Sequence, residues 1–219
     1  ESELMRSWPI EVIPHPINSK KWRNFDKNIA RKNLNLPSNI PLLLFGAIDG
    51  GNDPRKGFNL LLEAINHLKE NKNFEDLQLV VFGQRKPKKL PVFNYPVHFM
   101  GHLYDDLSLS NLYSSADVMI VPSRQEAFGQ TALEANSCGT PVVAFDIGGL
   151  SDIVEHKKTG FLAKPFNTIS LSDGISWSLN MRHNKEFKNY IIEKTKSQFS
   201  EKKVAKNYIK LYQKILGKL

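Results

Sequence analysis

The segment from Val118 to Asp146 alternates between apolar runs and turn residues in a way that few folds accommodate. Residues 118–121 form a short continuous apolar run, which is typical of a strand buried on both faces of a parallel sheet. Polar residues follow as a loop, and a helical segment then ends at Gly139 and Pro141. A second apolar run over residues 142–145 begins directly afterwards. The pattern predicts strand, loop, helix and strand in succession.

Two carboxylates flank the start of the predicted helix. Glu126 lies in the loop, and Glu134 lies about five residues into a helix that begins near Gly129, which is roughly 8 Å along its axis. Between them, the first amides of the helix, Gly129, Gln130 and Thr131, would attract a phosphate group. Because two carboxylates would repel that phosphate, a cation from elsewhere in the chain must reach the site.

Other apolar runs extend the pattern along the chain. Strands are predicted at residues 41–45 and 77–82, joined by a loop rich in Gly, Asp and Asn and by an amphipathic helix over residues 57–70. Shorter strands are predicted at residues 97–100 and 160–163. Strands that alternate with helices indicate an α/β fold. The prediction is a Rossmann-like, doubly wound parallel sheet of about six strands, with helices on both faces and a helical C-terminal tail.

The chain is predicted to form one domain with a distinct segment at each end. Residues 1–37 are interpreted as an interdomain segment with one strand candidate, Ile10 to Ile13, and residues 38–183 as the core. Residues 184–219 should be helical, and their last helix carries apolar residues at helical spacing. That stripe consists of Val204, Tyr208, Ile209, Tyr212 and Ile215. Helices are also predicted over residues 26–33, 107–116, 171–181, 185–197 and 201–216.

Composition excludes several classes of protein. The 219 residues include 41% hydrophobic residues, enough for a sizeable core, but no apolar run long enough to span a bilayer. The net charge of +8 is dispersed among polar residues, and no nucleic-acid-binding motif is present, so no nucleic acid partner is expected. The single cysteine, Cys138, is predicted to be a buried, inert thiol. No G-x-G-x-x-G follows a predicted strand, which argues against a dinucleotide-binding dehydrogenase.

Several stretches resemble one known family in order along the chain. Residues 122–154 are PSRQEAFGQTALEANSCGTPVVAFDIGGLSDIV. They are very similar to the E-x7-E signature of retaining glycosyltransferases with the GT-B fold, of the family 4 type that builds bacterial polysaccharides and glycolipids. The resemblance extends to IEVIPHPIN (10–18), FGAIDGGNDPRKGFNLLLEAI (45–65) and HKKTGFLAKPFN (156–167). These stretches correspond to the family's C-terminal, donor-binding domain, so the N-terminal acceptor domain is expected to be absent from this chain.

The resemblance implies roles for individual residues. Glu134 would hold the ribose hydroxyls of a nucleotide diphosphate sugar, and Glu126 would hydrogen-bond the donor sugar. Amides near Phe128, Gly129 and Gln130 would bind the sugar and the phosphate. Lys56 matches the family's diphosphate-neutralising lysine, which is the cation that the two carboxylates require. Glu126 and Lys56 are therefore the predicted catalytic residues, and Thr131, Gly46 and His102 are added to the predicted donor-binding residues.

The sequence departs from the family beside the first strand. Many members carry an arginine directly after the first-strand glycine, whereas here Gly46 is followed by Ala47. Arg55 is favoured as the replacement charge, with Arg124 as the alternative.

Other polar positions have two interpretations. Arg85 could contact the donor or lie in a solvated loop, and His102 could line the nucleobase pocket or face solvent. Gly148 and Gly149 could let backbone approach the sugar or form a plain turn before a short helix. No histidines and carboxylates have metal-ligand spacing, so no metal ion and no cofactor are expected.

The implied reaction is transfer of a sugar, with retention, from a nucleotide diphosphate sugar to a glycan or lipid-linked acceptor. The setting would be bacterial polysaccharide or lipopolysaccharide synthesis. The expected location is the cytoplasm, with peripheral association at the inner face of the membrane left open. The isolated chain is expected to bind the donor without turnover. The alternative, favoured only by Ala47, is a non-catalytic nucleotide-sugar-binding or scaffolding subunit of a glycan assembly complex.

Overall fold

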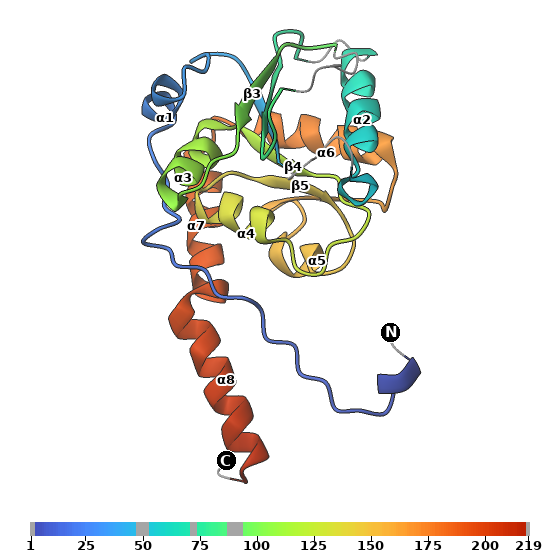
Figure 1. Cartoon of the computed structure of the whole chain (residues 1–219), viewed down its shortest axis with the longest axis vertical. Coiled ribbons are helices and arrows are strands. Elements are labelled where there is room, and N and C mark those ends of the chain that lie inside the picture. Colours follow the sequence, from blue (N-terminus) through green and yellow to red (C-terminus); the bar gives the residue numbers. More distant parts are fainter. Residues whose placement is uncertain (1–2, 47–52, 71–73, 87–93, 218–219) are drawn as a thin grey trace.

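The computed structural model describes residues 3–46, 53–70, 74–86 and 94–217. Within them, parallel strands form one six-stranded sheet in the order β3-β2-β1-β4-β5-β6 (Figure 1). The strands are β1 (Leu42–Gly46), β2 (Gln78–Phe82), β3 (Val97–Gly101), β4 (Val118–Val121), β5 (Val142–Phe145) and β6 (Gly160–Ala163). This is the strand order of a doubly wound sheet, so the predicted fold class is confirmed.

Helices cover both faces of the sheet because successive strand residues point to opposite sides. In β1, Leu42 and Leu44 pack into one hydrophobic core, while Leu43 and Phe45 pack into the other. The first core is covered by α3 (Asp106–Ser115), α4 (Gln130–Ser137) and α5 (Leu150–Ile153), and the second by α2 (Phe58–Glu70) and α6 (Thr168–Asn180).

Side-chain caps determine where several helices begin. The carboxylate of Asp26 accepts hydrogen bonds from the backbone amides of Asn28 and Ile29, which starts α1 (Lys27–Asn33) at its predicted position. α6 begins three residues before the predicted start because Asn167 accepts a hydrogen bond from the amide of Ser170. A polar cap can therefore extend a helix beyond its apolar stripe.

Cys138 follows the last residue of α4 and is fully buried. Burial raises the pKa of its thiol to about 12. The thiolate that reacts with oxidants and metals is thus strongly disfavoured, and the prediction of a buried, inert thiol is confirmed.

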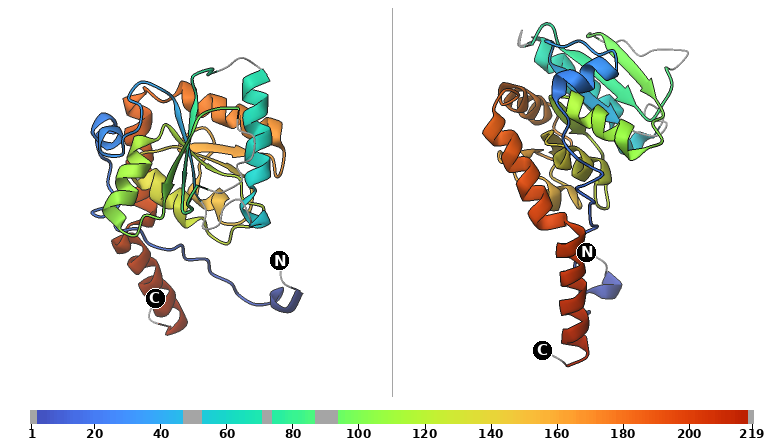
Figure 2. Two further views of the ribbon diagram at one scale, coloured as in Figure 1. Left: turned by 45° about the horizontal axis from the view of Figure 1, so that its top comes forward. Right: turned by 90° about the vertical axis from the view of Figure 1, so that its left-hand side faces the viewer.

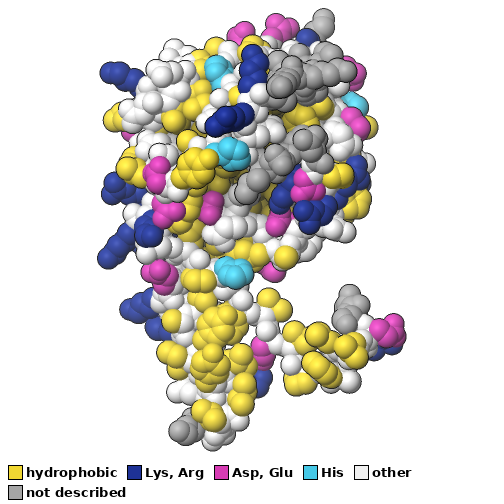
Figure 3. Space-filling view, viewed as in Figure 1, with side chains coloured by type: hydrophobic (Ala, Val, Ile, Leu, Met, Phe, Trp, Pro, Cys, Tyr) yellow, Lys and Arg dark blue, Asp and Glu magenta, His cyan; other side chains and the backbone are white. Residues whose placement is uncertain are grey.

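The C-terminal tail consists of α7 (Lys185–Phe199), which packs on α4, and α8 (Glu201–Ile215), which projects away from the sheet (Figures 1 and 2). Val204 is buried, but the rest of the predicted apolar stripe on α8 is exposed. Figure 3 shows hydrophobic side chains gathered over α8 and the N-terminal segment. In the described part of the chain, no helix is long and apolar enough to cross a bilayer.

The strand predicted at Ile10 to Ile13 is wrong. Residues 9–16 are extended but pair with no strand, and Ile10 and Val12 are 62% and 79% exposed. β-branched residues favour a strand only where a neighbouring strand offers hydrogen bonds and a surface to pack on. The segment joins the core at Ile17, whose amide donates to the carbonyl of Phe199 at 2.7 Å.

Candidate functional site

A cleft of about 640 Å³ opens at the carboxyl edge of the sheet, above the adjacent strands β1 and β4. The strand order reverses at this point, because β2 and β3 lie on one side of β1 while β4, β5 and β6 lie on the other. Open α/β sheets bind ligands at such a crevice. Among the residues predicted from the sequence, the lining contains Gly46, Arg55, Lys56, His102, Glu126, Thr131 and Glu134.

Lys56 and Glu126 form an ion pair inside this cleft. The Nζ atom of Lys56 lies 3.1 Å from Oε2 of Glu126, and the same oxygen lies 3.4 Å from the hydroxyl of the buried Ser123. The two partners are 70 residues apart in sequence. The structure thus brings the predicted cation to the predicted carboxylate.

Close backbone packing holds these two loops together. Lys56 ends the short 3-10 helix η2 (Pro54–Lys56), and Gly57 follows in the left-handed region with φ of 66°. A Cβ atom at Gly57 would lie 1.8 Å from the carbonyl oxygen of Pro122, so only glycine fits. The amide of Arg124 also donates to the carbonyl of Arg55 at 2.6 Å. Lys56 is therefore fixed relative to the loop after β4.

Gly148 and Gly149 support the other side of the same loop. A Cβ atom at Gly148 would lie 2.0 Å from the carbonyl oxygen of Glu126, and one at Gly149 would lie 2.6 Å from Cα of Phe128. Gly148 also has a positive φ of 50°. Because these two glycines have no side chain, the turn before α5 can lie directly against the backbone of the Glu126 loop.

Glu134 has a different environment from Glu126. It projects from α4, where Oε2 accepts a hydrogen bond from the hydroxyl of Tyr113 at 2.8 Å and Oε1 accepts one from the amide of Gln130 at 3.2 Å. Burial raises the pKa of Glu134, although these two hydrogen bonds oppose the rise. Its carboxylate is thus oriented and partly desolvated before any ligand arrives.

The start of α4 contributes less to the lining than predicted. Phe128, Gly129 and Gln130 do not line the cleft, whereas Thr131 does. The Phe128 ring packs against His15, with ring centroids 5.1 Å apart, and also against a phenylalanine of α7. Its side chain points away from the cleft because it fills the junction between the N-terminal segment and the tail.

The surrounding arginines differ in their placement. Arg55 lines the cleft, but its side chain is 71% exposed and its guanidinium pairs with Asp53 at 3.0 Å. Arg124 is exposed and lies over the ring of Phe166, and Arg85 is exposed as well; neither lines the cleft. Ala47, on which the missing-arginine argument rests, lies outside the described residues.

The sequence interpretation missed several residues of the cleft. In the sequence, Tyr113 lies among the apolar residues of a predicted helix and gives no sign of a polar role. Only its hydrogen bond to Glu134 in the structure shows that role. Tyr104 is 91% exposed and stacks on His102, with ring centroids 6.1 Å apart. Gly46, by contrast, was predicted. The structure shows why this position is a glycine, because the ring of Phe82 would lie 2.1 Å from a Cβ atom there. The one signal for Tyr104 in the sequence was its position, as an aromatic residue two places after the predicted site residue His102.

The searched part of the chain holds no cluster of three or more His, Cys, Asp or Glu residues that could bind a metal ion. The cationic groups at the cleft are instead the side chains of Lys56 and Arg55.

Comparison with known proteins identifies the family to which the chain belongs. The family described as glycosyl transferases group 1 matches residues 26–198. An uncharacterized glycosyltransferase of Methanocaldococcus jannaschii is 31% identical over 93% of this chain and 53% of its own length. This chain therefore spans about half the length of that relative.

Two solved structures share the fold. Sucrose-phosphate synthase from Thermosynechococcus elongatus has a TM-score of 0.74 and 26% identity, over 97% of this chain and 55% of that one. Anabaena HepE, solved in complex with UDP-glucose, has a TM-score of 0.70 and 18% identity, over 93% of this chain and 57% of that one. The resemblance to GT-B glycosyltransferases is confirmed, and the chain belongs to the glycosyl transferases group 1 family.

Proposed function

We propose that this chain is the donor-binding part of a retaining glycosyltransferase that uses a nucleotide diphosphate sugar. The observation that carries the proposal is the convergence of Lys56, Glu126 and Glu134 in one cleft at the strand-order reversal. A volume of about 640 Å³ lies within the usual range for small-molecule sites. Lys56 and two separately oriented carboxylates match the parts of such a donor, namely diphosphate, sugar and ribose.

Lys56 changes partner in the proposed reaction. In this structure its ammonium pairs with Glu126, which leaves both groups partly compensated. A diphosphate offers Lys56 a partner of higher charge, and this exchange frees the carboxylate of Glu126 to accept hydrogen bonds from sugar hydroxyls. As the sugar–phosphate bond breaks, Lys56 stabilises the negative charge that develops on the leaving diphosphate. This use of lysine requires no bound metal ion or other cofactor.

The ribose and the base occupy the other end of the cleft in this proposal. Glu134 accepts hydrogen bonds from the ribose hydroxyls, and Tyr113 holds its carboxylate in place. The stacked rings of His102 and Tyr104 offer a surface for the nucleobase. Thr131, which lines the cleft, completes the proposed contacts to sugar and phosphate. The backbone amides of Phe128, Gly129 and Gln130 could contribute only if the ligand extended past the present lining.

A solved relative supports the proposed donor class, whereas the proposed acceptor and location rest on the resemblance to family 4 glycosyltransferases. HepE binds UDP-glucose in its solved structure, which supports a nucleotide sugar donor here. The proposed acceptor is a glycan or a lipid-linked intermediate of bacterial polysaccharide or lipopolysaccharide synthesis, at the cytoplasmic face of the membrane. Since the observation that favoured a non-catalytic scaffolding subunit lies outside the described residues, the structure adds no support for that alternative.

Thermal unfolding in the presence of sugar nucleotides tests the proposal. The chain should be stabilised by one class among uridine, guanosine and adenosine diphosphate sugars, because a ligand that binds only the folded state raises the unfolding temperature. Lactose and free glucose serve as controls and should produce no shift. Equal, negligible shifts with all three nucleotide classes would contradict the assignment of the cleft. An assay of the full-length protein with the preferred donor, radiolabelled in its sugar, then separates transfer from mere binding.

Glu134→Gln should weaken nucleotide binding while making the fold less sensitive to rising pH. The raised pKa of Glu134 means that its contribution to stability is greatest in acid and is lost as pH rises through that pKa. Gln stays uncharged, so the stability of the variant relative to wild type should increase as pH rises above the ordinary pKa of Glu, about 4.3, and through the raised folded-state pKa. Calorimetry for binding and chemical denaturation across this range measure both effects.

The exposed Glu63→Gln on α2 is the matched control and should change neither quantity. Unaltered nucleotide affinity in Glu134→Gln would remove Glu134 from the donor site.

A further inference from the structure

A second cavity, of about 550 Å³, lies at the opposite edge of the sheet from the donor cleft. Ile40 and Pro41, just before β1, and Asp117, just before β4, form its floor. The donor cleft lies past the other ends of these same strands. The two cavities therefore share no lining residue and are separated by the length of a strand.

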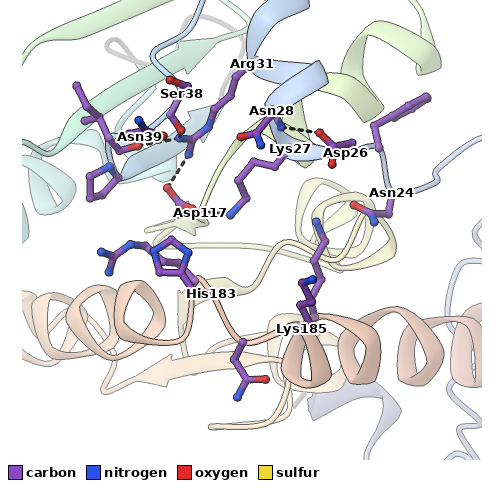
Figure 4. Close-up of a pocket in the computed structure, with 16 residues that line it drawn as sticks. Asn24, Asp26, Lys27, Asn28, Arg31, Ser38, Asn39, Asp117, His183 and Lys185 are labelled. Atoms are coloured by element: carbon purple, nitrogen blue, oxygen red, sulfur yellow. Dashed lines mark hydrogen bonds and ion pairs between the residues drawn. The ribbon is translucent and has the colours of Figure 1, made fainter.

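The walls of this cavity come from opposite ends of the sequence. Figure 4 shows Lys27, Arg31 and Asp117 on one side of the cavity. On the other side lie His183, from the connection between α6 and α7, and Lys185, the first residue of α7. Five lining side chains are cationic and two are carboxylates. The cationic ones are Lys27, Arg31, Arg182, Lys185 and Lys188.

Both carboxylates are already engaged by the protein. Asp117 pairs with Lys27 at 2.6 Å and with Arg31 at 2.7 Å. Asp26 caps α1 by accepting hydrogen bonds from two backbone amides. Asp117 thus compensates one of the two charges of Lys27 and Arg31, and no lining carboxylate pairs with Lys185 or with its neighbour one turn later, Lys188. The lining therefore carries excess positive charge on both sides of the cavity.

Lys188 lacks a counter-charge of its own. In the part of the chain that the structure describes, no carboxylate lies within ion-pairing distance of its ammonium group, while its aliphatic stem packs over Gly139. Burial and, next, the nearby charge of Lys27 lower the pKa of Lys188 to about 8. The first turn of α7, which begins after Asn184, adds the partial positive charge of a helix N-terminus. An anion would relieve this repulsion.

The rest of the lining is rich in uncharged hydrogen-bonding groups. Asn24, Asn28, Asn39, Asn184 and Ser38 line the cavity, and the side-chain oxygen of Asn184 also accepts a hydrogen bond from the amide of Phe187. Amide side chains both donate and accept hydrogen bonds, as hydroxyl groups do, so they suit a polyhydroxylated ligand. The cavity is also large enough for a monosaccharide with a phosphate group.

We propose that this cavity is a second ligand site, which binds a small phosphorylated sugar or polyol. The phosphate lies between Lys185 and Lys188, and the hydroxyl groups contact the asparagine side chains. Such a ligand bridges α1, which packs on α3, and the start of α7, which packs on α4. The site does not depend on the proposed transferase activity, because it shares no residue with the donor cleft.

Isothermal titration calorimetry with glucose 6-phosphate, inorganic phosphate and glucose tests the proposal. Glucose 6-phosphate should bind the chain with a Kd of about 1 mM or tighter. Lys188→Met, which keeps the packing of the stem, and the exposed Lys185→Gln should each weaken binding about tenfold or more. Lys196→Gln, an exposed lysine on the same helix outside the cavity, should bind as wild type does.

A Lys56→Ala variant separates the two cavities and should retain glucose 6-phosphate binding. Absence of binding to wild type would overturn the proposal, as would binding that is lost in Lys56→Ala but kept in Lys188→Met. Equal weakening by Lys196→Gln would show diffuse charge attraction instead of a site. Inorganic phosphate that binds as tightly as glucose 6-phosphate would overturn the role of the asparagines. Lys185→Gln keeps the test valid if Lys188→Met does not fold.

Discussion

Replacing Asp117 with asparagine is expected to lower the free energy of unfolding by about 3–5 kcal/mol, because Arg31 would keep a buried charge without a counterion. The side chains of Asp117 and Arg31 are 4% and 3% exposed. One carboxylate oxygen of Asp117 accepts from Arg31 and from the amide of Leu42 at 2.8 Å, and the other accepts from Lys27. The carboxylate thereby fixes α1 to the starts of β1 and β4.

The pH dependence of this variant has a defined sign. Burial opposes ionisation of Asp117, but the charges of Lys27 and Arg31, with hydrogen bonds from Lys27 and from the amide of Leu42, together lower the pKa of the carboxyl group. The stabilisation is therefore present above the unfolded-state pKa and lost as pH falls through the lowered folded-state value. The difference between wild type and Asp117→Asn should shrink in acid.

Urea denaturation monitored by circular dichroism measures the loss. Glu11→Gln breaks an exposed ion pair with Lys214 and should leave the unfolding midpoint unchanged. The double variant Arg31→Met with Asp117→Leu removes both charges and should recover most of the stability. If Asp117→Asn is no less stable than Glu11→Gln, the buried ion pair does not fix α1 to the starts of β1 and β4.

Lys56→Ala is expected to weaken binding of the preferred nucleoside diphosphate by about 10- to 150-fold, the loss of one hydrogen bond to a charged group. The substitution also leaves the carboxylate of Glu126, now 3.1 Å from the ammonium, without its partner and facing the diphosphate. Binding of the nucleoside alone should stay within about twofold, because it carries no phosphate. In a transfer assay of the full-length protein, loss of the group that stabilises the leaving diphosphate should lower kcat by about 10²–10³.

Titration calorimetry with diphosphate and nucleoside separates these effects. Lys164→Ala, an exposed lysine after β6 at the same edge of the sheet but outside the cleft, is the matched control. Adding Glu126→Gln to Lys56→Ala should restore part of the diphosphate affinity by removing the repulsion. Equal losses for nucleoside and diphosphate would show that Lys56 supports the fold of the cleft and not the phosphate.

The sequence by itself determined the order and type of the elements that position the site. The apolar runs at β1, β2, β4 and β5 and the breaks at Gly139 and Pro141 act over a few residues, so each could be interpreted locally. Parallel strands also place their carboxyl ends at one edge, which is why Glu126 was expected at the mouth of a cleft. The one strand that failed, Ile10 to Ile13, needed a partner strand that local propensity cannot supply.

Tertiary structure alone decided which side chains meet. Lys56 reaches Glu126 across 70 residues, Tyr113 orients Glu134 across 21, and Arg31 pairs with Asp117 across 86. Periodicity and turn chemistry carry no information about such pairs, since their distance depends on strand register and helix packing throughout the domain. The second cavity, built from α1 and the start of α7, has the same origin: its charges are ordinary surface lysines in the sequence and become a cluster only when the chain folds.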